Sequence, residues 1–117
     1  MLNNEKLAAG GFIVSNESSP ITEPEPGLRR QVLAHTPAMM LVRHTMTKGW
    51  RGAAHTHPHE QLVYVVSGRI GVRVKGTAFE ASTGHSFIVS SNVEHMANAL
   101  EDSVVLDVFT PARADYV

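Results

Sequence analysis

Short apolar or alternating runs recur along the chain from residue 30 onward and predict an all-β protein. Each run is rich in β-branched or apolar residues, and glycine, asparagine or acidic residues interrupt the chain between most of them. No window carries the period of a long helix. The runs are Arg30–Leu33, Met39–Met46, Gln61–Ser67, Gly71–Val74, Thr77–Ala81, Ser86–Val89, His95–Ala99 and Val104–Thr110. Many short strands at this spacing predict a sandwich or barrel.

Two of these runs are apolar on both faces. In 61–67 and in 104–110, odd-numbered and even-numbered positions alike carry large apolar side chains, so we expect both faces to be buried. A small barrel has one interior, and the second face therefore needs the N-terminal arm, a second sheet or another subunit to cover it. We expect a homodimer.

The N-terminal part differs in composition from the rest. The run Gly11–Val14 predicts a short strand that covers the barrel, whereas Ser15–Pro26 combines three prolines with serine and glutamate. Because proline denies a strand its ladder hydrogen bonds, we expect an irregular, solvated arm there. We divide the chain into an N-terminal strand and arm, residues 1–28, and a barrel, residues 29–117.

Length and composition narrow the class of protein. The chain has 117 residues, enough for a single domain with one core. A formal net charge of -1 gives no electrostatic reason to expect nucleic acid or a membrane as partner. We expect no signal peptide and no membrane span. With no cysteine, disulfides and thiolate sites are excluded, and we expect a cytoplasmic protein.

The segment 55–61, HTHPHEQ, holds the densest group of potential metal ligands. On a strand His55 and His57 project from one face and can share an ion. Gln61 has the same parity but would lie about 13 Å from His57 on a straight strand, so the chain must turn between them. His95 comes from a distant run, which only a closed barrel brings near. We expect His55, His57, Gln61 and His95 to bind one divalent transition metal.

Other assignments stay open for some of these residues. If the register slips by one position, Glu60 replaces Gln61 as the fourth ligand, although its parity is wrong. The remaining histidines are given peripheral or structural places: His59 beside the site or on its rim, His85 in a turn, and His35 and His44 within the fold.

Residues 49–99 resemble the two motifs of the cupin superfamily, the small RmlC-like barrels built as a double-stranded β-helix, or jelly roll. The residues that match the first motif are Gly49/Gly52, His55, His57, Gln61 in place of a glutamate, and Gly68. Those that match the second are Gly84, Ser90 in place of a proline, Asn92 in place of a glycine, and His95. The resemblance implies a cupin barrel with a metal site, and it leaves the reaction open because such folds host many chemistries.

The C-terminal run LDVFTPAR, residues 106–113, is a second indication of a site. Asp107 and Phe109 share one face of an apolar strand, and Pro111 then turns the chain so that Arg113 can return to the same cavity. One interpretation is a structural ion pair between Asp107 and Arg113, because a buried carboxylate is costly unless it is paired. In the other, Asp107 is a general acid/base, Phe109 a wall for a sugar ring and Arg113 a clamp on a substrate carboxylate.

With the four expected ligands, this trio resembles the pectin-degradation cupins of the KdgF type, which convert 4,5-unsaturated monouronates from pectin or alginate to linear ketonised forms. The resemblance implies that the metal polarises the sugar's oxygens, that Asp107 moves the proton and that Arg113 holds the carboxylate. The ion is nickel, zinc, manganese, iron or cobalt. A neutral fourth ligand leaves the charge of the ion uncompensated, which favours Lewis-acid work on anions.

Two other functions stay open. One is a metal-dependent dioxygenase acting on a small organic substrate, against which the missing carboxylate ligand counts. The other is a non-catalytic module that binds a metal or small ligand. All three predict a small molecule as partner, and no helix-turn-helix pattern or basic stretch indicates nucleic acid.

Overall fold

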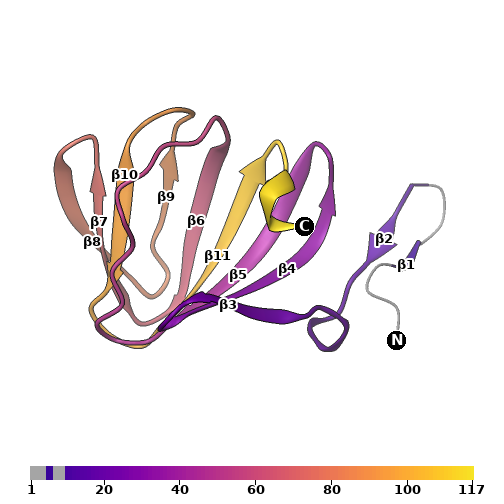
Figure 1. Cartoon of the computed structure of the whole chain (residues 1–117), viewed down its shortest axis with the longest axis horizontal. Helices are drawn as coiled ribbons and strands as arrows, with labels where there is room; N and C mark the ends of the chain where they lie inside the picture. The colour runs from indigo at the N-terminus through magenta and orange to yellow at the C-terminus, as the bar shows by residue number, and fades with distance from the viewer. Residues whose placement is uncertain (1–4, 7–9) are drawn as a thin grey trace.

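The computed structural model describes residues 5–6 and 10–117, in which two antiparallel sheets enclose one interior as a jelly-roll barrel (Figure 1). The larger sheet has the order β3-β4-β5-β11-β6-β9, and the smaller one β10-β7-β8. The helical segments among the described residues are two short 3-10 turns, η1 (Asn16–Ser18) and η2 (Ala114–Tyr116). The predicted all-β, single-domain fold is confirmed.

Every predicted strand from residue 30 onward is present, with shifted ends for some. The described strands are β1 (Glu5–Lys6), β2 (Phe12–Ile13), β3 (Ile21–Glu25), β4 (Leu28–Thr36), β5 (Met39–Met46), β6 (Glu60–Ser67), β7 (Arg69–Val74), β8 (Thr77–Ser82), β9 (Ser86–Val89), β10 (His95–Ala99) and β11 (Ser103–Thr110).

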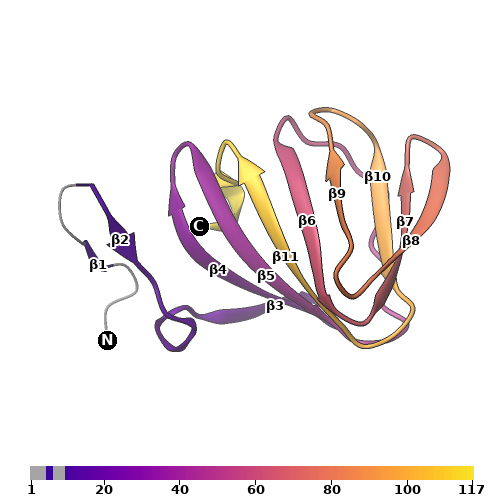
Figure 2. The same ribbon diagram turned by 180° about the vertical axis from the view of Figure 1, so that it is seen from behind.

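The N-terminal arm is more ordered than the sequence suggested. The prediction of an irregular segment is wrong for β3, which pairs with β4 at the edge of the larger sheet. The predicted covering strand is also corrected: β2 pairs with β1, and the ribbon views show this hairpin apart from the barrel (Figures 1 and 2). Phe12 and Ile13 are exposed there, so the hairpin does not cover the barrel.

Strict alternation along the central strands fills the barrel. The inward positions of β5, β6 and β11 carry Met40, Val42, Val63, Val65, Val105 and Phe109, all nearly inaccessible to solvent. The expectation that β6 is buried on both faces is wrong for the single chain. Its outward side chains Leu62, Tyr64 and Val66 are 42%, 46% and 41% exposed.

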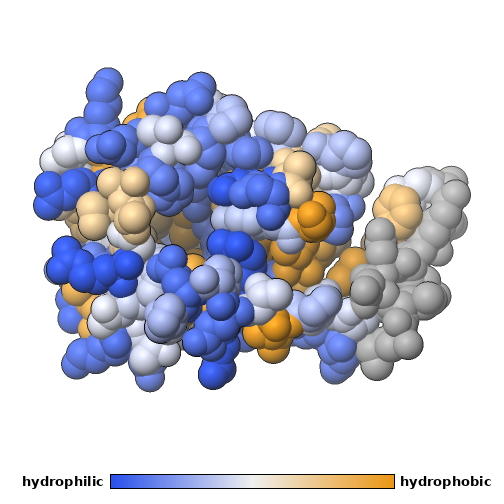
Figure 3. All heavy atoms as spheres, in the orientation of Figure 1, coloured by the Kyte–Doolittle hydropathy of each residue, from blue (hydrophilic) through white to orange (hydrophobic). Residues whose placement is uncertain are grey.

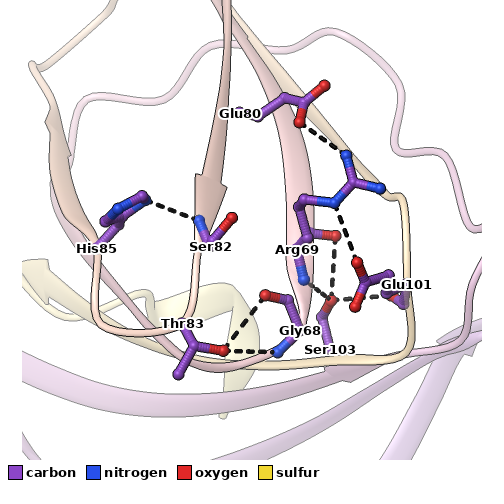
Figure 4. Close-up of polar contacts among 8 residues, drawn as sticks. All are labelled: Gly68, Arg69, Glu80, Ser82, Thr83, His85, Glu101 and Ser103. Atoms are coloured by element: carbon purple, nitrogen blue, oxygen red, sulfur yellow. Dashed lines mark hydrogen bonds and ion pairs between the residues drawn. The ribbon is translucent and has the colours of Figure 1, made fainter.

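Turns at one end of the barrel are tied together by polar contacts (Figure 4). Arg69 donates to Glu80 at 2.7 Å and to Glu101 at 3.0 Å, which joins β7 to β8 and to the β10–β11 turn. Ser103 accepts from the Arg69 backbone N–H at 3.0 Å. Gly68 has φ +93°, and a Cβ there would collide with Ser103, so this turn requires glycine.

The surface of the barrel is largely polar in the view of Figure 3, with apolar side chains gathered next to the N-terminal hairpin. No helix among residues 5–6 and 10–117 is long and apolar enough to cross a membrane.

Candidate metal centre

A segment outside the named strands brings His55 to His95. Residues 49–55 run antiparallel beside β10, and His55 and His95 exchange both backbone N–H···O bonds at 3.0 Å. Residues paired in this way project their side chains from one face of the sheet. His57 follows two residues on, and its carbonyl accepts from the Asn92 N–H at 2.8 Å. One ligand nitrogen from each of the three histidines lies within 4.8 Å of the others.

All three rings are oriented by backbone carbonyls. The Nδ1 atoms of His55, His57 and His95 lie 3.0, 3.0 and 2.9 Å from the carbonyl oxygens of Ala53, His59 and Val93. Since a carbonyl can only accept, each Nδ1 carries the proton and each Nε2 keeps a free lone pair. This is the second-sphere arrangement that prepares histidine to bind a metal.

Burial favours the uncharged form of two of these rings. Desolvation lowers the pKa of His57 and of His95, and positive charge on Arg113 acts in the same direction. Nε2 of His95 is buried and has no hydrogen-bond partner within the described residues. A buried lone pair without a partner fits a site built for a cation.

Gln61 lies beside the cluster because the chain bends between His57 and β6. Its side-chain nitrogen donates to Oδ1 of Asp107 at 2.7 Å, and its side-chain oxygen lies 3.1 Å from Nε2 of His57. Since Oε1 and the unprotonated Nε2 are both acceptors, a cation between them would satisfy both. The side chain of Glu60 is exposed, whereas that of Gln61 lines the cavity.

Asp107 is buried beside these residues, with 3% of its surface exposed. Nδ1 of His44 donates to its Oδ2 at 2.7 Å. The interpretation of Asp107 and Arg113 as a structural ion pair is wrong. Arg113 pairs with Asp115 through two hydrogen bonds of 3.0 and 2.9 Å, and these hold the pKa of Asp115 below its usual range.

The barrel encloses a cavity of about 420 Å³, within the usual size of small-molecule sites. Its lining combines apolar side chains, among them Met46, Trp50 and Ile70, with polar and charged ones. The polar lining consists of Glu25, Arg30, His44, His55, Gln61, His95, Asp107, Arg113, Asp115 and Tyr116. Every catalytic or substrate-binding residue predicted from the sequence, Asp107, Phe109 and Arg113, lies on this cavity.

A model of the cupin domain matches residues 42–109, more than half of the chain. The chain belongs to the cupin family. This cupin is 31% identical over 104 residues to the pectin degradation protein KdgF of Dickeya dadantii (strain 3937), covering 87% of this chain and 94% of the relative.

Two solved structures resemble the cupin along most of its length. KdgF from a Halomonas species superposes with a TM-score of 0.86 and 37% identity, covering 92% of this chain and 99% of that one. An RmlC-like cupin from Shewanella frigidimarina gives a TM-score of 0.87 and 32% identity, covering 99% and 100%.

Three cavity residues of the cupin escaped the sequence-based interpretation. His44, which was assigned a structural role, contacts Asp107. The sequence could have indicated its inward position, because it shares a strand face with Met40, Val42 and Met46. Arg30 contacts His44 from β4. Tyr116, whose pKa is raised by burial, reaches the cavity from η2, and no pattern in the sequence indicates this.

The other histidines are placed largely as predicted. His59 lies next to the cluster, its ring centroid 5.4 Å from that of His57. His85 is exposed in the turn between β8 and β9, where it accepts from the Ser82 N–H.

Proposed function

We propose that this cupin is a metal-dependent enzyme that opens and ketonises 4,5-unsaturated monouronates from pectin or alginate. One observation supports this most: the buried carboxylate of Asp107 adjoins the three-histidine cluster through Gln61, in a cavity that also holds Arg113. The similarity to proteins named for pectin degradation supports the substrate class.

The proposed reaction is an isomerisation that needs no water and no oxidant. The hydroxyl on C1 loses its proton, the bond from C1 to the ring oxygen breaks, and C1 becomes an aldehyde. The electron pair of the broken bond stays on the ring oxygen, which leaves an enolate at C5. A proton added at C4 converts this enolate to the C5 ketone. One proton leaves the substrate and one returns.

Asp107 is the group we assign to both proton steps. It accepts the proton from the C1 hydroxyl and returns a proton at C4, so the enzyme ends unchanged. Its oxygens each have further lone pairs beyond the hydrogen bonds from His44 and Gln61. A divalent ion held by His55, His57, Gln61 and His95 supplies a Lewis acid for the sugar's oxygens.

Arg113 is the proposed clamp for the substrate carboxylate. The guanidinium of Arg113 donates two hydrogen bonds to the carboxylate of Asp115, and in this proposal the substrate carboxylate replaces that of Asp115. Phe109 lies beside the clamp, with the Arg113 guanidinium carbon 5.2 Å from its ring centroid. This position supports Phe109 as an apolar wall for the sugar ring.

We also propose that the cupin is a cytoplasmic homodimer. The outward face of β6 and β9 exposes Leu62, Tyr64, Val66 and Ile88, the last by 59%. Leu62 pairs with Val108 of β11 and with Ile88 of β9, so the apolar side chains are contiguous. A continuous apolar face of this kind suits a second copy of the chain.

The direct test follows the ultraviolet absorbance of the substrate's conjugated double bond. Metal-loaded protein is expected to remove it faster than the spontaneous reaction, and Asp107→Ala to lose about 100-fold or more of this rate with metal still bound. Asp102→Asn, at the opposite end of the barrel, is the control and keeps the rate. No acceleration by metal-loaded protein contradicts the proposal, and oxygen consumption would favour a dioxygenase.

A further inference from the structure

We propose that Arg30 and His44 are positioning residues that fix the orientation of the Asp107 carboxylate and, through it, of the Gln61 amide. The inference rests on the proposed function because that function assigns the proton transfers to Asp107. The four side chains form a continuous chain of hydrogen bonds across the barrel. Arg30 contacts His44, His44 contacts Asp107, and Asp107 contacts Gln61, at 3.1, 2.7 and 2.7 Å.

The register of the larger sheet brings these residues together. Arg30 on β4 lies directly opposite His44 on β5. His44 in turn lies opposite Val105 on β11, and Asp107 is two residues further along the same strand and face. Directly opposed and diagonal neighbours on one face are within reach of long side chains. The contacts therefore follow from the strand pairing.

The direction of each hydrogen bond is determined by Arg30. A guanidinium has donors only, so Nε2 of His44 must accept from Arg30 Nε. The single ring proton of His44 is then on Nδ1, where it is donated to Oδ2 of Asp107. A proton on Nε2 would place two donors against each other.

The guanidinium of Arg30 is itself held in place by the C-terminal turn. Its central carbon lies 3.7 Å from the ring centroid of Tyr116, and that of Arg113 lies 4.3 Å from the same centroid. Stacking on an aromatic face restricts the plane of a guanidinium. Tyr116 thus keeps Nε of Arg30 directed at His44.

The chain has a consequence at the metal centre. Oδ2 of Asp107 accepts a hydrogen bond from His44, and Oδ1 accepts one from the amide nitrogen of Gln61. The amide oxygen of Gln61 therefore points toward Nε2 of His57. If His44 is lost, the carboxylate can rotate, and both the proton-transfer geometry and the Gln61 orientation become variable. A misplacement of this kind is costly for catalysis.

The kinetic test compares two substitutions of His44 with a matched control. His44→Leu removes the donor and is expected to lower kcat by about 10- to 100-fold with little change in KM. His44→Asn keeps an N–H close to the position of Nδ1 and should recover most of that loss. His35→Leu replaces a histidine of β4 outside the cavity lining and should leave the rate unchanged. Equal rates for His44→Leu and wild type overturn the inference.

A second readout does not depend on turnover. In ¹H–¹⁵N spectra of the histidine rings at neutral pH, His44 is expected to carry its proton on Nδ1, and Arg30→Met to give a mixture of the two tautomers. A proton on Nε2 in wild type, or an unchanged tautomer in Arg30→Met, overturns the inference. If wild type shows the expected tautomer but does not convert the uronate, the proposed function fails while the hydrogen-bond chain stands.

Discussion

The side-chain oxygen of Gln61 lies 3.1 Å from Nε2 of His57, and neither atom has a proton to place between them. The carbonyl of His59 takes the proton of His57 on Nδ1, and Asp107 takes the amide N–H of Gln61. Both atoms thus keep lone pairs available to a cation, next to a cluster in which one nitrogen from each of His55, His57 and His95 lies within 4.8 Å of the others. This relationship is expected of a metal-ligand set and not of histidines that merely lie close together.

Removing the amide should therefore weaken metal binding. Gln61→Leu is expected to lower the affinity for nickel or zinc by about tenfold or more, because one ligand is lost and Asp107 loses its donor. Calorimetric titration of metal-free protein measures this. Glu60→Gln is the control, and it also tests the one-residue shift in register. A larger loss in Glu60→Gln than in Gln61→Leu would make Glu60 the ligand.

The pair formed by Arg113 and Asp115 should compete with an anionic substrate. Asp115 is 59% exposed on its side chain, so the ion pair is weak, about 0–1 kcal/mol. Asp115→Asn should therefore lower KM by up to about fivefold. Arg113→Lys should raise KM because an ammonium lacks the two parallel donors. Steady-state kinetics separates the two effects, and an increased KM in Asp115→Asn would mean that Asp115 holds Arg113 in its working position.

If the protein dimerises through the outward face of β6, a single charged substitution on this face should produce monomers. Leu62→Glu should halve the mass measured by light scattering, since a carboxylate cannot be buried there without a partner. Phe79→Glu places the same charge on β8 of the smaller sheet, where the side chain is 38% exposed, and should leave the mass unchanged. A wild-type protein that is already monomeric contradicts the proposed dimer.

Two glycine substitutions separate backbone strain from steric collision. Gly68 and Gly84 both have positive φ, but an added Cβ meets no atom within 4 Å at Gly84 and collides with Ser103 and Asp102 at Gly68. Gly84→Ala is expected to cost about 1–2 kcal/mol of the free energy of unfolding. Gly68→Ala should cost clearly more. Equal costs in urea titrations would show that the turn relaxes without penalty.

The sequence contained enough to predict the barrel and the three-histidine cluster. The alternation of apolar and polar residues predicted the strands. The two-residue spacing of His55 and His57, together with a bend after Pro58, indicated how the ligands come together. β3 was missed because the three prolines of residues 15–26 were taken to exclude pairing. Pro24 is tolerated because β3 is an edge strand. The backbone N–H that proline lacks is not needed on the side of the strand that has no neighbour.

Other features depend on tertiary structure that no local pattern encodes. His44 shared the parity of buried methionines and was still assigned a structural place, because its partner Asp107 lies 63 positions away. The contact of Tyr116 with Arg30 arises only when the C-terminal turn folds back over the cavity. The two apolar faces of β6 were recognised, but the sequence does not specify what covers the outer one.

The central claim is that a metal-loaded barrel directs protonation of the substrate, and product NMR after conversion in D₂O tests it most directly. Metal-loaded protein is expected to give the ketonised uronate with deuterium on one face of C4, and chelation of the metal should abolish this conversion. Conversion no faster than without protein, or an equal mixture of both C4 diastereomers, would contradict the account.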